Sequence, residues 1–589
     1  MTTRFHRQLP FGATLVEPGR THFRLFAPAQ PEVTVEIEGG TPAVMTRDHD
    51  GWFEADVRCG AGTRYRFRLA DGLAVPDPAS RAQTGDVHGH SVVVDPTAYR
   101  WTRPDWRGRP WPEAVVYELH CGLLGGFAGV ARELPRLATL GVTAVELMPI
   151  NDFPGRRNWG YDGVLPFAPD TAYGTTDELK ALVDSAHEHG LMILLDVVYN
   201  HFGPDGNYLG RYAPSFFRSD IGTPWGAAID FRRPEVRRFF IEKALYWIME
   251  YRFDGLRFDA VHAIGEPDWL DEMAAEVRAT VETGRRVHLV LEHDGNVASH
   301  LRGDFDAQWN DDAHHVLHVL LTGEHEGYYA DYADDPAARL ARCLAEGFDY
   351  QGEPSRHRNG EPRGTPSADL PPTAFVLFLQ NHDQIGNRAL GERLTALAEP
   401  AALEAAIALQ MLCPQIPLMF MGEEQASRSP FLFFCDHGEE LANAVREGRR
   451  REFAKFAAFA DPALRDTLPD PCAAETFARS SPRPDPERAP ARRELYRRLL
   501  AVRRADIVPR LPHTGSLGAE ALGASAVMAR WRLGDGTILT IATNLGRETV
   551  TTRPADGRLL FESLDGAAHS LAAGRLPGRV TVARLGAAA

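Results

Sequence analysis

Four acidic residues stand at the ends of short apolar runs that are far apart in the chain. Asp196 follows LMILL, Asp259 lies in FDGLRFDAVH, Glu292 follows HLVL, and Asp383 ends FVLFLQNHD. Runs of this length suit buried parallel strands, and the carboxyl ends of the strands of a parallel barrel share one rim. Cleavage of a glycosidic bond uses two carboxyl groups, one to protonate the leaving oxygen and one to attack or support the sugar cation. The layout therefore predicts a barrel with acids at one rim and favours sugar chemistry.

Eight apolar segments match the strands of such a barrel, and amphipathic segments alternate with them. One of the amphipathic segments, TTDELKALVDSAHEHG, places Thr175 and Thr176 ahead of Asp177 and Glu178, which indicates a helix start. The fold class is therefore expected to be α/β, with a closed (β/α)8 TIM barrel. The expected strands are VVYELH, AVELMPI, LMILLDVVYN, GLRFDAV, HLVLEH, FDAQWN, AFVLFLQNHD and IPLMFMGEE.

The chain of 589 residues is longer than a barrel requires, and three domains are expected. Residues 1–97 alternate apolar and polar residues between turns, which predicts an immunoglobulin-like β-sandwich that resembles a carbohydrate module. Its aromatic residues Trp52, Phe53 and Tyr65 suit either a shield for the barrel or a sugar-binding surface. Residues 98–510 form the expected catalytic barrel, with a rim insertion between about Thr322 and Pro372, and residues 511–589 a small β domain.

Composition limits the partners. A net charge of −16 argues against nucleic acid, and no apolar stretch is long enough to span a membrane. The start, MTTRFHRQLPFGATL, lacks a signal-peptide core, so a cytoplasmic location is expected.

Six scattered cysteines form no CxxC pair and are expected to be reduced. In the cluster His314, His315 and His318, only the first and last have metal-ligand spacing, which favours helix packing or a sugar contact over a metal site.

Four segments resemble, in order, the signature regions of the alpha-amylase superfamily: DVVYNH, GLRFDAVH, the glutamate of LVLEHD, and QNHD. Longer strings resemble maltooligosyltrehalose trehalohydrolases, namely YELH, FPGRRNWGYDGV, VYNHFGPDGNYLGRYAP, TPWG, QWNDDAHHVLHVLLTGE, GYYADY and FLQNHDQIGNRALGER. This resemblance implies hydrolysis of the α-1,4-glucosidic bond that joins trehalose to a maltooligosaccharide, by a retaining mechanism. This chemistry requires no cofactor, and no residue is assigned to a metal, while a structural calcium ion in a rim loop stays open. It also implies a pathway link, without a complex, to the synthase that makes this substrate.

The resemblance assigns the three central acids. Asp259 is expected to be the nucleophile, Glu292 the general acid and then base, and Asp383 the acid that orients the sugar. Arg257 lies two residues before Asp259 on a strand, so both side chains should share one face and the guanidinium should keep Asp259 ionised. Glu292 must start protonated, and burial beside other carboxylates should raise its pKa.

Further residues carry supporting roles by resemblance. Asp196 and Asn200 are expected to hold the site in place. The chain departs from the family pattern in the short loop after His120 and at Gln425, and we expect these departures to affect substrate specificity. The residues expected to bind substrate are Trp159, Tyr161, His201, Arg257, His262 and His382.

Other functions remain open. A branching, debranching or amylase-like α-glucan enzyme shares the four regions, and product analysis separates it from a trehalose-releasing enzyme. A non-catalytic glucan-binding protein should lack one of the acids, whereas Asp259, Glu292 and Asp383 are all present. A metal-dependent hydrolase is disfavoured because the histidines are dispersed among sugar-binding motifs.

Overall fold

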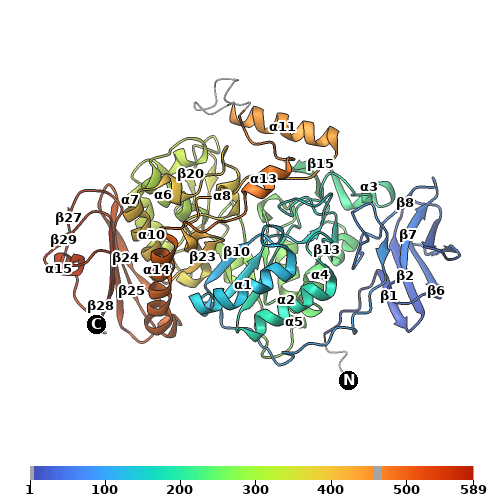
Figure 1. Ribbon diagram of the computed structural model, residues 1–589, viewed down its shortest axis with the longest axis horizontal. Coiled ribbons are helices and arrows are strands. Elements are labelled where there is room, and N and C mark those ends of the chain that lie inside the picture. The colour runs from blue at the N-terminus through green and yellow to red at the C-terminus, as the bar shows by residue number, and fades with distance from the viewer. Residues whose placement is uncertain (1–4, 224, 455–466, 588–589) are drawn as a thin grey trace.

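A closed barrel of eight parallel strands occupies the middle of the molecule in the computed structural model, which describes residues 5–223, 225–454 and 467–587 (Figure 1). Every residue of the first four barrel strands is buried, and this explains why they read as continuous apolar runs. The predicted (β/α)8 barrel is confirmed. Its strands are β10 (Val116–Leu119), β11 (Ala144–Leu147), β14 (Met192–Val197), β17 (Gly255–Phe258), β18 (His288–Leu291), β19 (Ala307–Trp309), β22 (Phe375–Phe378) and β23 (Ile416–Phe420).

Helices alternate with these strands and cover the barrel. The helix start expected near Thr175 is present: its side chain accepts a hydrogen bond from the Glu178 amide, and the Glu178 side chain accepts one from the Thr175 amide in return. The main barrel helices are α1 (Gly126–Leu140), α2 (Thr176–Glu188), α4 (Pro234–Met249), α5 (Asp268–Thr280), α6 (Asp311–Thr322), α10 (Pro400–Leu412) and α14 (Ala489–Val502). None of the helices in the described ranges combines the length and apolar character that a membrane span requires.

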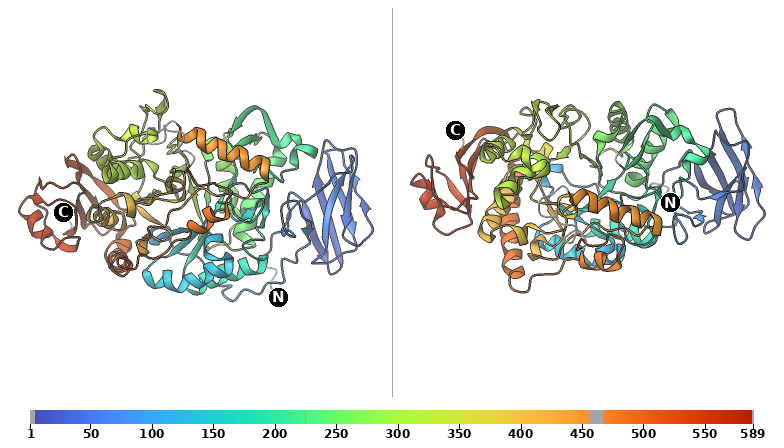
Figure 2. Two further views of the ribbon diagram at one scale, coloured as in Figure 1. Left: turned by 45° about the horizontal axis from the view of Figure 1, so that its top comes forward. Right: turned by 90° about the horizontal axis from the view of Figure 1, so that it is seen from above.

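Two β domains lie on opposite sides of the barrel, along the long axis of the molecule, in both further views (Figure 2). In the N-terminal one, Phe53 and Tyr65 are buried between two sheets, so neither offers a surface to a sugar, while Trp52 is half-buried beneath Arg24. Its first sheet contains β1 (Gly12–Glu17), β2 (Arg20–Phe26), β6 (Trp52–Val57) and β5 (Thr46–Arg47), and its second β4 (Ala43–Val44), β3 (Val33–Ile37), β7 (Arg64–Leu69), β8 (Ala74–Val75) and β9 (Ser91–Val92).

The C-terminal domain is also built of β-strands, as expected, and it packs on α10 and on α7 (Pro336–Glu346). The insertion between Thr322 and Pro372 therefore does more than shape the rim, because α7 supports this distant sheet. The strands are β24 (Gly515–Gly523), β25 (Ala526–Arg532), β26 (Ile538–Asn544), β30 (Val580–Gly586) and β28 (Arg558–Glu562), with β27 (Val550–Thr551), β29 (Arg575–Leu576) and helix α15 (Ala567–Ala572) beside them. The expected boundaries after residues 97 and 510 stay a prediction.

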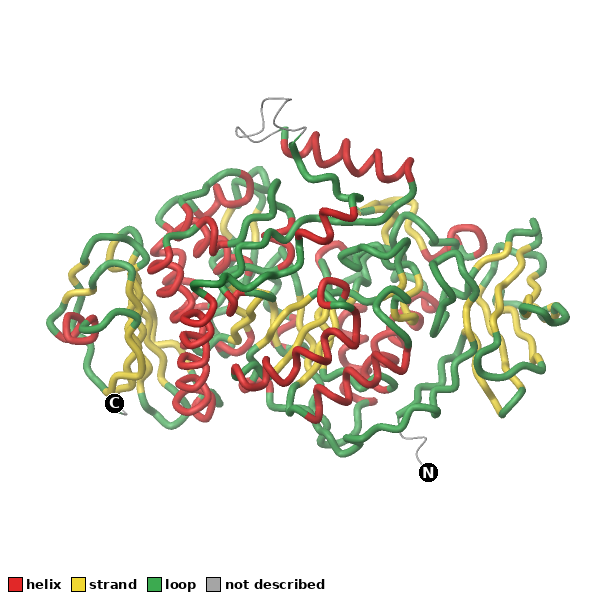
Figure 3. Tube along the Cα trace, in the orientation of Figure 1, coloured by secondary structure: helices red, strands yellow, loops and turns green. Residues whose placement is uncertain are grey.

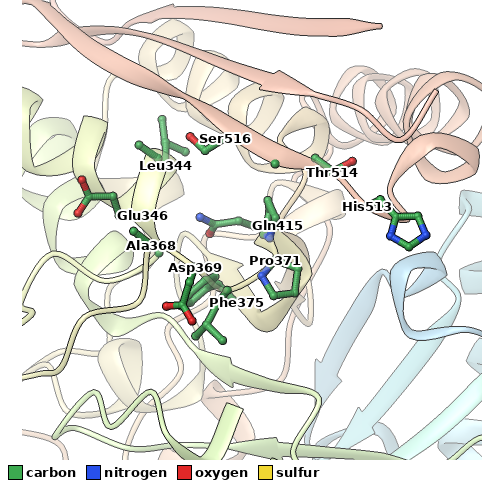
Figure 4. Close-up of a pocket in the computed structure, with 15 residues that line it drawn as sticks. Leu344, Glu346, Ala368, Asp369, Pro371, Phe375, Gln415, His513, Thr514 and Ser516 are labelled. Atoms are coloured by element: carbon green, nitrogen blue, oxygen red, sulfur yellow. The ribbon is translucent and has the colours of Figure 1, made fainter. Parts of the chain in front are cut away.

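A cavity of about 390 Å³ lies where the C-terminal domain meets the barrel (Figure 4). Its walls include Phe375 at the first position of β22, Gln415 just before β23, and Thr514 just before β24. Because Phe375 begins β22 and Gln415 precedes β23, the cavity lies at the amino ends of these barrel strands, opposite the rim where the acids were expected. In such barrels, residues at the amino ends of the strands usually contribute to stability rather than to catalysis.

Loops and short elements crowd the other end of the barrel (Figure 3). Helix α11 lies across the top of the molecule in Figure 1. Besides α11 (Glu439–Phe453), these elements are β12 (Asn151–Asp152), β13 (Leu165–Pro169), α3 (Leu209–Tyr212), β15 (Phe217–Thr223), β16 (Gly226–Ile229), β20 (Glu353–Pro354), β21 (Pro362–Arg363), α8 (His382–Gly386), α9 (Leu394–Leu397) and α13 (Ala474–Arg479).

Arg503, which follows α14, links α14 to the end of α10 and to the turn into β23. Its guanidinium is buried and donates hydrogen bonds to the carbonyl groups of Met411, Cys413 and Gln415, at 3.0, 2.7 and 2.8 Å. These carbonyl groups lie at the end of α10 and in the turn into β23, where no later helical residue supplies a donor. Arg503 therefore fixes the last strand of the barrel against α14.

Replacing Arg503 tests this junction. We expect Arg503→Met to lower the free energy of unfolding by about 2–4 kcal/mol, because three buried carbonyl groups lose their donor. The neighbouring Arg504 is exposed, so Arg504→Met is the matched control and should change stability by less than about 0.5 kcal/mol. Thermal unfolding followed by circular dichroism compares the three proteins. Equal midpoints for the two variants would show that the junction does not depend on Arg503.

Candidate active site

A cavity of about 420 Å³ opens at the carboxyl ends of the barrel strands. It is the place where most of the sequence-predicted residues meet, although they come from segments far apart in the chain. Arg257, Asp196 and Asn200 contact this group from positions outside the lining. The predicted residues in the lining are Trp159, Tyr161, His201, Asp259, His262, Glu292, His382 and Asp383.

The guanidinium of Arg257 is the centre of the charged network. It is almost fully buried and lies 2.7 Å from Asp196 Oδ2, 2.9 Å from Asp259 Oδ1 and 2.7 Å from Glu292 Oε2. The ring of Trp309 supports its other side, 4.0 Å from the guanidinium carbon. Because one planar group contacts all three, the carboxyl groups of Asp259 and Glu292 lie side by side.

Asp259 is held in the charged state. Burial opposes ionisation, but the charges of Arg257 and His201 and a hydrogen bond from Asn200 outweigh it, so the pKa of Asp259 lies below its usual value. Asn200 Nδ2 donates to both the side-chain Oδ2 and the main-chain carbonyl of Asp259, each at 3.0 Å. These contacts fix the direction of the carboxylate as well as its charge.

Glu292 has the opposite electrostatic environment. Burial raises its pKa well above the usual value; Arg257 opposes this shift, and Asp259, Asp311 and Asp383 add to it. Its Oε2 atom also accepts a hydrogen bond of 2.8 Å from the Ala260 amide. Since Arg257 and this amide both contact Oε2, the proton belongs on Oε1. The environments of Asp259 and Glu292 thus separate a base from an acid, as acid and base catalysis requires.

The backbone at Ala260 is arranged for this contact. Ala260 adopts a φ of 39°, in the left-handed region that alanine seldom occupies, and this turns its amide toward Glu292. Backbone strain of this kind is typically found at functional sites.

Asp383 faces the same cavity. Burial raises its pKa, with His382 and Arg257 opposing the shift and Asp259 adding to it. Its Oδ1 atom accepts a hydrogen bond of 2.6 Å from Nδ2 of Asn387, the residue that follows α8. The carboxyl group is therefore held in position without a direct contact to Arg257.

A chain of hydrogen bonds runs from the cavity into the barrel. Tyr161 Oη lies 2.7 Å from Asp196 Oδ2 and 2.8 Å from His382 Nε2, and its ring stacks on that of His382. His382 Nδ1 bonds the buried carboxylate of Glu118 on β10, which also accepts from the His382 amide. Burial favours the neutral ring, but Glu118 outweighs it, so the pKa of His382 lies above its usual value. His382 is thus more readily protonated than a histidine in water.

The loop NWGYD carries two aromatic side chains into the site. Gly160, with a φ of 104°, separates Trp159 from Tyr161, and a Cβ atom there would lie 2.1 Å from the Pro149 carbonyl oxygen. Trp159 stacks on Phe431 and approaches Gly386 so closely that a Cβ atom at Gly386 would overlap its ring. Both glycines are therefore required by close approaches of the chain.

The remaining predicted residues, His201 and His262, also line the cavity. His201 Nε2 lies 3.1 Å from the Tyr161 carbonyl oxygen, and its ring stacks on that of Trp225. His201 Nδ1 contacts the side-chain oxygen of Asn200. His262 accepts a hydrogen bond from the Asp294 amide at 3.4 Å. Polar ring atoms and stacked aromatic faces are the surfaces on which sugars bind.

Sequence reasoning left Glu118, which lies behind His382, and several residues of the cavity lining without a role. Glu118, Trp225, Asp311 and Tyr328 lie within strings that carried the resemblance, YELH, TPWG, QWNDD and GYYADY, so the signal was present but not resolved to single residues. Nothing in the sequence pointed to Phe433. Residues of the lining in this class are Asn158, Asp162, Trp225, Ala260, Asp294, Asp311, Tyr328, His357, Gln384, Asn387 and Phe433.

The three histidines of the cluster on α6 have different environments. His314 bonds the Leu379 carbonyl group and His318 bonds Glu324, so both are satisfied inside the protein, while His315 lines the cavity. Within the described ranges, no group of three or more His, Cys, Asp or Glu side chains is arranged to hold a metal ion. Gln425 bonds Glu424 and is not part of the lining.

Comparisons with known proteins agree with this geometry. A model described as the alpha amylase catalytic domain matches residues 78–215, and a domain of unknown function, DUF3459, matches residues 514–582. A malto-oligosyltrehalose trehalohydrolase from Deinococcus radiodurans is 42% identical over 515 residues, covering 84% of this chain and 83% of the relative. The protein of the same name from Saccharolobus solfataricus is 40% identical over 460 residues, covering 75% and 80%.

The whole chain also resembles a solved structure. A crystal structure from Salmonella typhimurium, described as a candidate alpha amylase, superposes with a TM-score of 0.92 at 43% sequence identity. It covers 99% of this chain and is itself covered completely, so the likeness includes both β domains.

Replacing Glu118 tests the charge network. We expect Glu118→Gln to lower the pKa of His382, measured by NMR of 13C-labelled histidine and identified by the resonance lost in His382→Gln. Because the folded pKa is raised, the stability that the pair provides is fully present below the unfolded pKa of about 6.5 and is lost as the pH rises through the folded pKa. The stability deficit of the variant should therefore shrink at higher pH.

Glu440 on α11 is exposed, so Glu440→Gln is the control for this experiment and should leave the His382 resonance unchanged. A His382 pKa that is the same in Glu118→Gln as in the unaltered protein would contradict the assignment.

Proposed function

The chain belongs to the malto-oligosyltrehalose trehalohydrolase family, and we propose that it hydrolyses the α-1,4-glucosidic bond next to the trehalose end of maltooligosyltrehalose, releasing trehalose and a maltooligosaccharide. One observation carries the proposal for the chemistry: Arg257 joins an ionised Asp259 to a Glu292 of raised pKa inside a cavity at the barrel rim. The names of the relatives support the choice of substrate.

In the first step, Asp259 attacks the anomeric carbon while Glu292 gives the proton on Oε1 to the glycosidic oxygen. The bond to that oxygen breaks, trehalose leaves, and the maltooligosyl unit is bound to the Asp259 carboxylate as an ester. Retaining glycosidases place the two carboxyl groups about 5–5.5 Å apart, and the shared guanidinium of Arg257 supports such a side-by-side arrangement.

In the second step, Glu292 is a carboxylate and takes a proton from water. The resulting hydroxyl adds to the anomeric carbon, Asp259 leaves as a carboxylate, and the original anomeric configuration is restored. Arg257 and the Ala260 amide are already aimed at Glu292 Oε2, so they stabilise the charge that appears there after the first step.

The other residues recognise the sugars. Asp383 accepts hydrogen bonds from the hydroxyl groups of the reacting glucose, and His201 and His382 bind hydroxyl groups beside it. Tyr161, Trp159 and His262 also line the cavity and contribute further contacts to the sugars. Asp196 and Asn200 act through Arg257 and Asp259, which they contact directly, and are positioning residues.

We extend the proposal to partners and location. A neutral oligosaccharide suits a chain of net charge −16 better than nucleic acid does. Its substrate must come from an enzyme that converts the end of a maltooligosaccharide into a trehalose unit, the activity expected of a maltooligosyltrehalose synthase, and no complex with that enzyme is implied. The cytoplasmic location and the domain boundaries remain predictions from the sequence.

Product analysis tests the function. Purified protein is incubated with maltooligosyltrehalose and, separately, with a plain maltooligosaccharide of the same length, and the products are separated by anion-exchange chromatography. We expect free trehalose from the first substrate and at least tenfold slower cleavage of the second. Maltose or new branch points from the plain substrate would assign the chain to amylase-like or branching enzymes, and no product from either would favour a binding protein.

Glu292→Gln is the active-site control, because it removes the transferable proton but keeps the shape of the side chain. We expect trehalose release to fall by at least about 10³-fold, within the range that general acid catalysis supplies. Glu440→Gln, on the exposed surface of α11, should retain full activity.

A further inference from the structure

Two cysteines that are far apart in the sequence meet beside the cavity. The sulfur atoms of Cys435 and Cys472 lie 2.9 Å apart, and both residues are free thiols. Cys435 is buried and Cys472 is partly exposed. The sequence spacing gave no sign of this pair, because the intervening chain contains α11 and returns to the same place.

The main chains around the two cysteines are already paired. The Cys435 amide donates to the Pro471 carbonyl group at 3.0 Å, so the residue before Cys472 lies directly against Cys435. Nearby, the Leu432 amide donates to Ser480 Oγ at 3.0 Å, and Arg446 on α11 lies 2.9 Å from Asp470. The two segments are therefore held side by side by contacts that do not involve the thiols.

The segment 431–437 forms part of the cavity wall. Phe433 lines the cavity and meets the Trp159 ring edge-on, with 5.2 Å between ring centres. Asp436 accepts a hydrogen bond from the Arg156 amide at 2.9 Å, and the Leu432 carbonyl group accepts one from Trp159 at 3.0 Å. Whatever fixes Cys435 thus fixes the wall that faces the loop NWGYD.

We propose that Cys435 and Cys472 form a reversible disulfide that fastens the cavity wall 431–437 to the segment 470–480. A disulfide needs a sulfur separation of about 2.05 Å, so the two sulfur atoms must approach by less than about 1 Å, and the paired main chains already bring them together. Such a small movement leaves Phe433 in place. The bond therefore restrains the wall without closing the cavity.

The oxidant is a small-molecule disulfide, RSSR. The Cys472 thiolate, which is accessible from solvent, attacks one sulfur of RSSR and releases RS⁻. The Cys435 sulfur then attacks Cys472 in the mixed disulfide, loses its proton and releases a second RS⁻. Two thiols are oxidised, one RSSR is reduced to two RSH, and excess dithiol reverses the reaction. Burial and the contact with Cys472 raise the pKa of Cys435, which agrees with its acting second.

Peptide mapping tests the bond without reference to any substrate. The full-length protein is treated with oxidised glutathione, its free thiols are alkylated, and it is digested with trypsin without reduction. We expect a linked pair of peptides, residues 429–446 with residues 466–479, which disappears after dithiothreitol. The linked pair should be absent in Cys472→Ser and in Cys435→Ser. It should persist in Cys59→Ser, the matched control, because Cys59 is also partly exposed.

Function gives the second readout. The oxidised protein should keep its rate of trehalose release within about twofold, and its half-life of thermal inactivation should lengthen at least threefold, an effect lost in Cys472→Ser. Alkylation of both cysteines after oxidation, or a link that uses Cys59, would overturn the proposal. An unchanged half-life or a greater loss of rate in the linked protein would also overturn it, because the bond would then not hold the wall in its present position.

Discussion

The buried guanidinium of Arg257 is the contact on which the site depends. It pairs with Asp196, Asp259 and Glu292 while the Trp309 ring covers one of its faces. One cation cannot neutralise three carboxylates, so the acids respond to their remaining contacts. Burial disfavours the charged form of both carboxyl groups; at Asp259 it is outweighed by Arg257, His201 and Asn200, whereas at Glu292 the charges of Asp259, Asp311 and Asp383 add to it. The division between nucleophile and acid thus follows from burial together with the different partners of the two carboxyl groups.

The barrel makes that arrangement possible. Asp196, Arg257 and Glu292 belong to or directly follow β14, β17 and β18, which are consecutive strands in the closed sheet. Asp196 and Arg257 are also register partners. Parallel strands end at one rim, so residues separated by dozens of positions in the chain become neighbours. The loops above the rim then add what the strands cannot supply, such as the rings of Trp159 and Tyr161 and the wall at Phe433.

Much of this was predictable from the sequence, for a physical reason. Barrel strands are buried on both sides, so their apolar runs were conspicuous, and the acids at the ends of four of these runs marked the rim. Glu118 was missed because a single acid in a strand gives no sign of the histidine that it contacts from two strands away in the barrel. Phe433 and the Cys435 and Cys472 pair depend on how long loops return, which local patterns do not encode. The insertion that contains α7 was expected only at the rim, because its packing against β24 is a tertiary contact.

The most direct test of the account is to trap the ester on Asp259. A maltosyl fluoride needs no proton from the enzyme to lose its leaving group, so Glu292→Gln should form the glycosyl intermediate and then hydrolyse it slowly. Mass spectrometry of tryptic peptides should find the added maltosyl mass on residues 258–278, which contain Asp259, and not in the double variant that also carries Asp259→Asn. An adduct on a peptide that contains Asp196 or Asp383, or no adduct together with inversion of the anomeric centre, would contradict the account.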